Sequence, residues 1–252
     1  MPALTVAALP GVPLVRPGDD LLPIIQAALE RAAIVLQDDD ALVITSKIVS
    51  KAEGRLVALA EVEPRDEALQ LAEETGKDPR IVELVLRESV YVSRKARNLL
   101  VVEHRLGFIS ANAGIDQSNI GGDDAYALLM PYDPDGTARR IHDALRTTTG
   151  KHVAVIISDS HGRPFRMGNV GVAIGVAGMP GLLDLRGERD LYGRELRNTQ
   201  QGYADLVASA ASLVSGEGSE GYPLVHVRGL RFPRRDGSSR ELIRLPEQDL
   251  YR

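Results

Sequence analysis

The sequence predicts an α+β fold of two interleaved subdomains. Predicted strands and helices follow one another irregularly, without the repeated unit of about 30 residues that builds a doubly wound parallel sheet. Residues 153–157 form a run of five apolar, mostly β-branched residues, which is typical of a strand buried on both faces. No internal repeat, low-complexity tract or linker separates the chain into parts. One interwoven unit is therefore favoured over two separate domains.

Bulk composition excludes several classes of protein. The chain has 252 residues, and 44% of them are hydrophobic, which is enough for a full core. A net charge of −5 and the lack of a basic stripe argue against nucleic-acid binding. Cysteine is absent, so disulfides, thiolate catalysis and Cys-ligated metals are excluded. No apolar run has the length of a membrane span and no basic signal-peptide segment is present, so we expect a cytoplasmic protein without membrane contact.

Periodicity places the individual elements. Helices are predicted where apolar residues recur three to four apart, with Asp19 or Asp20 as the first N-cap, at residues 21–36, 65–75, 79–88, 133–146 and 203–214. Strands are predicted for short apolar runs between turns, at residues 41–45, 99–103, 108–112, 153–157, 169–177 and 224–227, with an edge strand in residues 1–10. Glycines within residues 169–177 indicate close approach of another backbone.

Polar side chains follow the strand at residues 153–157. Asp159 and Ser160 are expected just past its C-terminal end, where open α/β sheets bind ligands. A carboxylate beside a hydroxyl suits a hard cation such as Mg²⁺ or Mn²⁺. An aspartate in a turn also commonly caps the next segment, so both interpretations stay open on this stretch alone. His161, a lone histidine in the same loop, is expected to be exposed.

Basic residues follow the strand at residues 41–45. Lys47, Lys51 and Arg55 come after it in what looks like a polar turn. If they converge on a nucleotide, Lys51 would place a point charge against phosphate and Arg55 would bind bidentately. Basic loop residues are also commonly just solvated, and this alternative stays open.

Two further loops carry candidate ligands. Asp116 follows the strand at residues 108–112, and it would complete a two-carboxylate metal site if it meets Asp159; otherwise each is a turn residue. Residues 216–221 spell G-x-G-x-x-G, but this loop follows a helix and precedes a strand, the reverse of the dinucleotide-binding order. Its amides could still wrap phosphate oxygens, with Glu217 as a metal ligand, or it is only a connector.

Other common sites are excluded by their missing motifs. The five histidines show no paired spacing typical of zinc ligands. The chain also lacks a Walker A motif and a G-x-S-x-G nucleophile elbow.

Six motifs in one order along the chain are more specific than any single motif. They are GVPLV at residues 11–15, PGDD at 17–20, TSKIVSKAEGR at 45–55, AGIDQSN at 113–119, SDSHGRPFR at 158–166 and DLYGRE at 190–195. Together they resemble the coenzyme F420:L-glutamate ligase (gamma-glutamyl ligase) family. The resemblance runs from about residue 5 to about residue 230, nearly the whole chain.

The resemblance implies a GTP-dependent ligase that adds L-glutamate to the lactyl-phospho carboxylate of coenzyme F420-0, with further γ-linked glutamates as an option. It implies an α+β fold of mixed sheets and intertwined segments, with residues 1–252 as a single ligase unit that lacks a flavin-type C-terminal domain. It also implies a homodimer, two divalent metal ions, Mg²⁺ or Mn²⁺, and K⁺ as an activator.

Site residues are carried over by position. The resemblance assigns Asp116 and Asp159 to one metal ion and Ser160 with Glu217 to a second, and Lys51 joins the two aspartates as catalytic. Nucleotide contacts are implied at Val12, Pro13, Leu14, Val15, Ser46, Lys51, Asn119, Gly216, Glu217, Gly218, Ser219, Glu220 and Gly221. Ser160 stands where many members have Thr, which keeps the hydroxyl. The loop at residues 187–194 also resembles the family, without an assigned role.

The chemistry agrees with these residue types. A carboxylate is a poor acyl donor at neutral pH, so forming an amide requires an acyl phosphate first, and metal ions with Lys51 would offset the phosphoryl charge. Two alternatives remain: a related ligase acting on another carboxylate acceptor, and a non-catalytic nucleotide-binding regulator. The joint presence of Asp116, Asp159, Ser160 and Lys51 counts against the second.

Overall fold

The computed structural model describes residues 2–118, 120 and 125–249, and it confirms the α+β class. The main sheet has five strands in the order β1-β12-β2-β8-β9. The pair β2 and β8 is parallel and the other pairs are antiparallel. The strands are β1 (Thr5–Ala8), β2 (Ala41–Thr45), β8 (Ala154–Arg163), β9 (Arg166–Ala177) and β12 (Leu224–Arg228).

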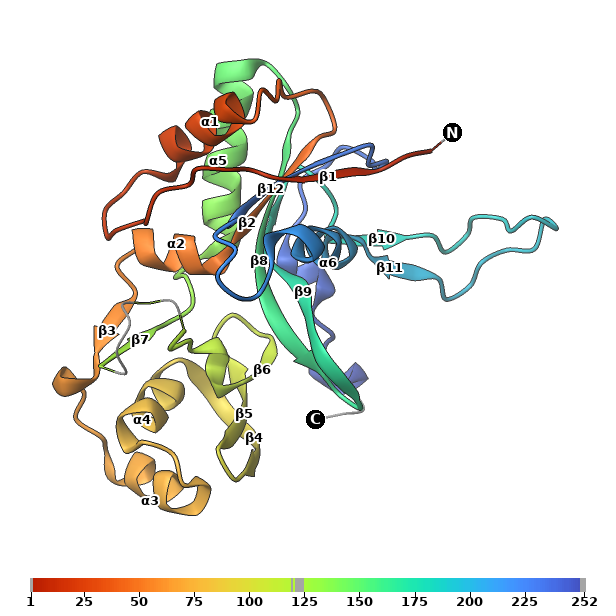
Figure 1. Ribbon diagram of the computed structural model, residues 1–252. Coiled ribbons are helices and arrows are strands. Elements are labelled where there is room, and N and C mark those ends of the chain that lie inside the picture. The colour runs from red at the N-terminus through yellow and green to blue at the C-terminus, as the bar shows by residue number, and fades with distance from the viewer. Residues whose placement is uncertain (1, 119, 121–124, 250–252) are drawn as a thin grey trace.

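Helices cover both faces of this sheet (Figure 1). Residues of α1 (Leu21–Arg31) and α5 (Pro134–Thr149) share one apolar cluster with Leu42 and Ile44 of β2. Residues of α6 (Tyr203–Ser215) share a second cluster with Val43 on the opposite face. Residues 153–157 are fully buried, so the prediction of a strand covered on both faces is confirmed.

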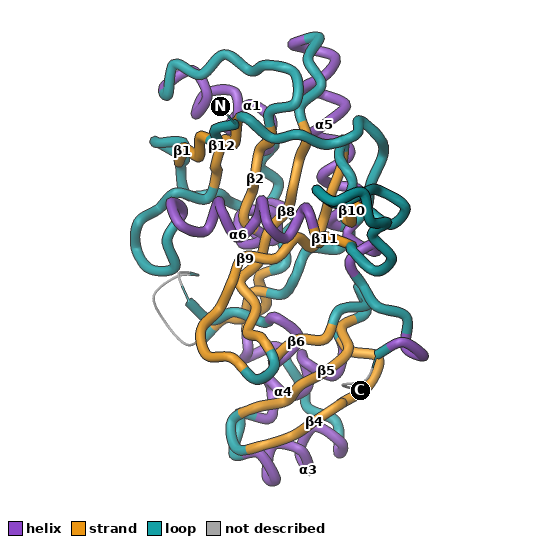
Figure 2. The backbone as a smooth tube through the Cα atoms, turned by 90° about the vertical axis from the view of Figure 1, so that its right-hand side faces the viewer, coloured by secondary structure: helices purple, strands orange, loops and turns teal. Residues whose placement is uncertain are grey.

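The chain leaves the main sheet through α2 (Ser46–Ala52) and returns at α5. Between them it builds a smaller unit with its own apolar cluster, at the lower end of the tube in Figure 2. This unit contains β3 (Leu56–Ala58), α3 (Asp66–Thr75), α4 (Pro79–Arg87), β4 (Ser89–Ala96), β5 (Leu99–His104), β6 (Ile109–Ala111) and β7 (Tyr126–Leu128). Short 3-10 helices lie at Leu59–Glu61, Asn112–Gly114, Ser239–Leu242 and Pro246–Gln248.

Two predicted boundaries are wrong in ways that matter for the site. Asp159 and Ser160 lie inside β8, not beyond it, because β8 continues to Arg163 as a ribbon paired with β9. A register shift between Ile157 and Ser158 marks the point where the buried strand becomes this ribbon. Residues 46–52, read as a polar turn, form α2, because Ile48 and Val49 are buried against the core.

Glycines in β9 let two helices approach the strand, as predicted. A Cβ on Gly171 would lie 2.5 Å from the backbone oxygen of Ala208 in α6. A Cβ on Gly175 would lie 2.4 Å from the backbone oxygen of Pro134 in α5. Real Cβ atoms do not come this close, so β9 is clamped between two backbones.

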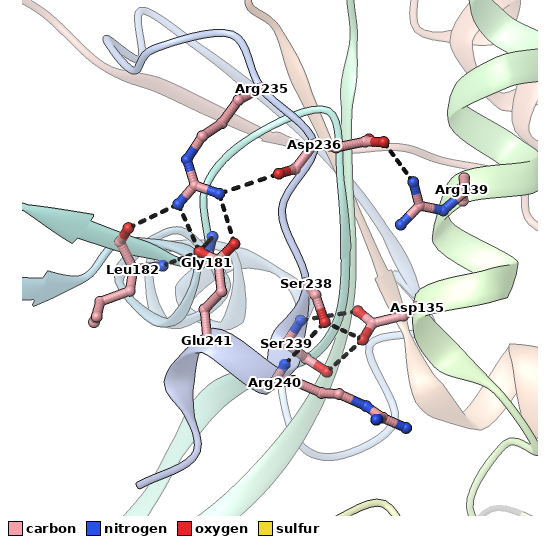
Figure 3. A network of polar contacts seen from close by, with 10 residues as sticks. All are labelled: Asp135, Arg139, Gly181, Leu182, Arg235, Asp236, Ser238, Ser239, Arg240 and Glu241. Carbon is pink, nitrogen blue, oxygen red and sulfur yellow. Dashed lines mark hydrogen bonds and ion pairs between the residues drawn. The ribbon is translucent and has the colours of Figure 1, made fainter. Parts of the chain in front are cut away.

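Two carboxylates fix the C-terminal segment against the sheet (Figure 3). Asp135, in the first turn of α5, accepts hydrogen bonds from Ser238 Oγ at 2.7 Å and from the backbone of Ser239 at 2.9 Å. Glu241 accepts from the backbone of Gly181 at 3.1 Å and pairs with Arg235 at 2.6 Å. Contacts between residues far apart in the sequence therefore hold residues 235–241 against α5 and the segment at Gly181.

A hairpin arm extends from the body near α6 (Figure 1). Its strands are β10 (Leu182–Asp184) and β11 (Gln200–Gly202), and Leu191 and Tyr192 lie exposed in the loop between them. Within the described ranges, no helix is long and apolar enough to cross a membrane.

A buried ionic cluster holds the start of the smaller unit. Glu88, at the end of α4, accepts hydrogen bonds from Arg55 at 2.6 Å and Arg105 at 3.0 Å, and His104 Nε2 lies 3.5 Å away. Burial by itself raises the pKa of Glu88, but hydrogen bonds from His104 and Arg55 outweigh it and lower the pKa to about 2. The folded protein therefore binds this proton more weakly than the unfolded chain.

The stabilisation from Glu88 should be lost in acid. Because its pKa is lower in the folded state, its contribution is complete above about pH 4.5 and disappears as the pH falls toward about 2, up to about 3 kcal/mol. Urea unfolding of wild type and Glu88→Gln should show a difference in unfolding free energy that shrinks over this range. The exposed Glu73→Gln is the control, and a difference for Glu88→Gln that does not depend on pH would contradict the expectation.

Candidate functional site

A cavity of about 410 Å³ lies where the C-terminal ends of β2 and the buried part of β8 meet the smaller unit. Its lining is mostly polar and comes from both units and from the segment after α6. The residues are Thr45, Ser46, Lys47, Ala111, Gly114, Ile115, Asp116, Ser118, Ser158, Asp159, Ser160, Asn169, Gly171, Ser212, Ser215, Gly216, Glu217, Gly218, Tyr222 and Pro223.

Strand pairing brings Asp159 to the start of α2. Thr45 is paired with Ser158 in the parallel ladder, so the next residues, Ser46 and Asp159, emerge side by side. Ser46 Oγ donates to Asp159 Oδ1 at 2.7 Å. On the other side, His161 Nε2 lies 2.9 Å from Asp159 Oδ2. One carboxylate oxygen thus accepts a hydrogen bond from the protein, and the other lies close to the imidazole ring.

His161 is not the exposed loop residue that was expected. Its side chain is only 14% exposed, and its ring lies 5.1 Å from that of Phe108 in the smaller unit. The residue belongs to β8, and the pairing of that strand with β9 fixes its direction. Asp159 is therefore supported from both units of the fold.

The second acid of the cavity, Asp116, interacts with two lysines. Lys47 Nζ lies 2.6 Å from Asp116 Oδ2, and the backbone N–H of Ser118 donates to Asp116 Oδ1 at 2.6 Å. Burial raises the pKa of Asp116, but the contacts with Lys47 and Ser118 outweigh it and lower the pKa overall. Burial and repulsion from Lys47 lower the pKa of Lys51, which Asp116 partly opposes. One turn of α2 thus presents two ammonium groups near Asp116.

The glycine loop contributes part of its length to the cavity. Ser160 Oγ donates to Glu217 Oε1 at 2.6 Å, which ties the loop to β8. Gly216 has φ +74°, and a Cβ there would meet the Glu220 carboxyl group at 2.2 Å. Glu220 turns back and accepts a hydrogen bond from the Gly218 N–H at 2.8 Å. That amide is therefore already engaged within the loop.

The structure brings together part of the implied site. Those that line one cavity are Ser46, Asp116, Asp159, Ser160, Gly216, Glu217 and Gly218. Lys51 lies next to this group through its interactions with Lys47 and Asp116. Their roles as metal ligands, nucleotide contacts and catalytic groups stay predictions.

Other implied residues lie elsewhere. The lining does not include Val12, Pro13, Leu14, Val15, Ser219, Glu220 or Gly221. Val15 belongs to the apolar core, whereas Leu14 is 88% exposed. Arg55 takes no part either, because its guanidinium is buried against Glu88 and the backbone oxygen of Met130. Asn119 lies outside the described residues.

The donor set suits hard divalent cations. Carboxylate and hydroxyl oxygens are what Mg²⁺ and Mn²⁺ prefer, and Asp116, Asp159, Ser160 and Glu217 offer them in one cavity. Among the described residues, no three Asp, Glu or His side chains are already gathered as a ligand set. A cation would therefore compete with Lys47 at Asp116 and with Ser160 at Glu217.

Sequence reasoning missed several lining residues. Ser212 and Ser215 lie on the last turns of α6, and Asn169 lies in the ribbon strand β9. The available signal was polarity: these residues interrupt segments that are otherwise apolar. That signal alone does not tell a cavity from solvent.

Fold and cavity together define an α+β protein whose candidate site is built from carboxylates, hydroxyls and lysines. The model of the F420-0:gamma-glutamyl ligase family matches residues 11–229, and the chain belongs to this family.

Three relatives named coenzyme F420:L-glutamate ligase are similar to it along nearly their whole length. The protein of Methanothermobacter thermautotrophicus is 48% identical over 251 residues, with 99% of each chain covered. That of Methanopyrus kandleri is 46% identical over 256 residues, covering 100% of this chain and 99% of the relative. That of Haloarcula marismortui is 43% identical over 255 residues, covering 99% and 96%.

Proposed function

We propose that this protein is a GTP-dependent, GDP-forming ligase that joins L-glutamate to the carboxylate of coenzyme F420-0 in the cytoplasm. One observation carries the proposal. The cavity of this family member is lined together by Asp116, Asp159, Ser160, Glu217 and Lys47. The same reaction would add further γ-linked glutamates to the product. We also propose that the protein forms a homodimer.

The proposed reaction has two steps. A carboxylate oxygen of the acceptor attacks the γ-phosphorus of GTP, which gives an acyl phosphate and GDP. The amine of glutamate then attacks the acyl carbon, so that an amide forms and phosphate and a proton leave. Neither step requires a nucleophile from the protein.

The residues of the cavity have distinct tasks in this scheme. Lys47 and Lys51 would attract phosphoryl oxygens, since both lie on α2 near Asp116. Asp116 and Asp159 would hold one divalent cation, and Ser160 with Glu217 a second, which neutralise phosphate charge when bound. Ser46 would hold the Asp159 carboxylate in place, with His161 beside it.

The test is a ligation assay with purified protein. Protein, GTP, Mn²⁺, K⁺, L-glutamate and coenzyme F420-0 should give a product heavier by one glutamyl residue, with one GDP formed per amide. ATP in place of GTP, and other carboxylates in place of F420-0, separate this function from that of a related ligase. Folded protein that binds GTP without forming product would instead favour the non-catalytic regulator.

A further inference from the structure

The tip of the β8–β9 ribbon has a strained backbone. The turn Pro164–Phe165 joins the two strands, and Phe165 has φ +60°. Proline followed by a residue with positive φ is the pattern of a type II turn, whose second central position normally takes Gly or Asn. A bulky side chain with positive φ is an outlier that costs conformational energy. Phenylalanine therefore occupies a position where the backbone favours glycine.

Burial of the Phe165 side chain offsets little of this conformational energy. The Phe165 side chain is 90% exposed, and Met167, two residues on, is 95% exposed. A second irregularity follows, because Gly162 pairs with Asn169 while Arg163 pairs with Arg166, which leaves Met167 and Gly168 bulged. Bulges and strained residues gather near functional sites. Two large apolar side chains are thus presented to solvent on an irregular hairpin tip.

The same tip carries two arginines, Arg163 and Arg166, that form no ion pair with another described residue. Arg163 and Arg166 face each other across the two strands, and like charges directly opposite one another destabilise a hairpin. Arg163 Nη2 donates to the backbone oxygen of Met167 at 3.0 Å. Arg163 Nε is buried and has no hydrogen-bond partner in the described part of the chain. A phosphate or carboxylate bound at the tip would pair with the guanidinium charges and relieve the repulsion.

The tip is continuous with the cavity. Ser160, Asn169 and Gly171, from the same ribbon, line the cavity wall. Phe165 is four residues from Asn169, which is at most about 13 Å along the chain. The ribbon projects from the main sheet toward the smaller unit in Figures 1 and 2. A ligand that reacts in the cavity and has an extended tail would reach the tip.

We propose that residues 163–167 bind the far end of the carboxylate acceptor. An aromatic ring system lies against Phe165 and Met167, and the anionic linker between ring and carboxylate is held by Arg163 and Arg166. The inference rests on the proposed function, because coenzyme F420-0 combines these features: a deazaflavin ring joined through a phosphodiester to the carboxylate that reacts.

Kinetics of Phe165→Gly test the aromatic contact. We expect the KM for F420-0 to rise about tenfold while the KM values for GTP and glutamate stay unchanged. Glycine suits φ +60°, so the variant should unfold at the same or a higher temperature than wild type. Phe165→Trp should keep a near-normal KM. Val35→Ala is the matched control, since Val35 is 80% exposed at the opposite end of β2 from the cavity.

A binding measurement that does not depend on turnover uses the absence of tryptophan from the chain. Phe165→Trp introduces a single fluorescent reporter. Its emission should change on titration with F420-0 and not with GTP alone. Arg166→Gln in this background should weaken the titration about tenfold, and the exposed Arg97→Gln should leave it unchanged.

Several outcomes would overturn the inference. An unchanged acceptor KM for Phe165→Gly would do so, and so would an unchanged emission of Phe165→Trp on addition of F420-0. A changed oligomeric state of Phe165→Gly would instead assign the tip to an interface between copies of the chain. Failure of the wild type to ligate would refute the proposed function instead. The emission titration would then still decide whether the tip binds this acceptor.

Discussion

Replacing Asp159 with asparagine should lower kcat by at least about a thousandfold without unfolding the protein. Asp159 supplies one of three carboxylates in the cavity, next to Ser46 and His161. Asparagine keeps the shape and an oxygen that can accept the hydrogen bond from Ser46 Oγ. What the variant loses is the negative charge that would attract the proposed divalent cation.

Three measurements separate this charge effect from a structural one. Ligation rates give kcat, thermal unfolding reports the fold, and titration with Mn²⁺ by calorimetry reports cation binding. Asp143→Asn, an exposed carboxylate on α5, is the matched control and should behave as wild type. Near-normal turnover of Asp159→Asn, or Mn²⁺ binding as tight as that of wild type, would remove Asp159 from the proposed metal site.

The sequence could predict those parts of the fold that depend on local patterns. The run at residues 153–157 is buried on both faces as expected. Asp20 caps α1 through the N–H of Leu22, and Asp133 caps α5 through that of Gly136. Capping and burial are properties of a few neighbouring residues, so they can be read without knowledge of the whole chain.

The sequence could not predict the extent of β8, because residues 158–163 are polar and contain glycine. Their local preference is for a turn, and pairing with β9 overrides it. Likewise α2 begins directly at the end of β2, and Thr45 caps it without a side-chain hydrogen bond, so the local sequence does not separate this helix from a turn.

The cavity itself is a product of long-range pairing. Thr45 and Ser158 are more than 100 residues apart, and only their place in one parallel ladder sets Ser46 beside Asp159. Asp116 reaches the same cavity from the smaller unit. Family motifs indicated these residues, whereas contacts such as Lys47 with Asp116 and His161 with Asp159 required the folded chain.

Gly175→Ala should destabilise the protein by about 3 kcal/mol. Gly175 lies in β9 where the backbone of Pro134, the first residue of α5, crosses the strand. An added Cβ would stand 2.4 Å from the Pro134 oxygen and 2.8 Å from its side chain. The nearest atom is backbone, so no flexible side chain can move aside, and α5 must shift away from the sheet.

Chemical denaturation of Gly175→Ala measures the effect, with Gly162→Ala as the control. Gly162 lies in the same ribbon pair, and the nearest atom to its added Cβ is a side-chain oxygen at an ordinary 3.8 Å. Its unfolding free energy should stay within about 1 kcal/mol of wild type. Because α5 also carries Asp135, which holds the C-terminal segment, a displaced helix would loosen that contact too. Equal stability of the two variants would show that β9 and α5 separate easily, against the close clamp described for this strand.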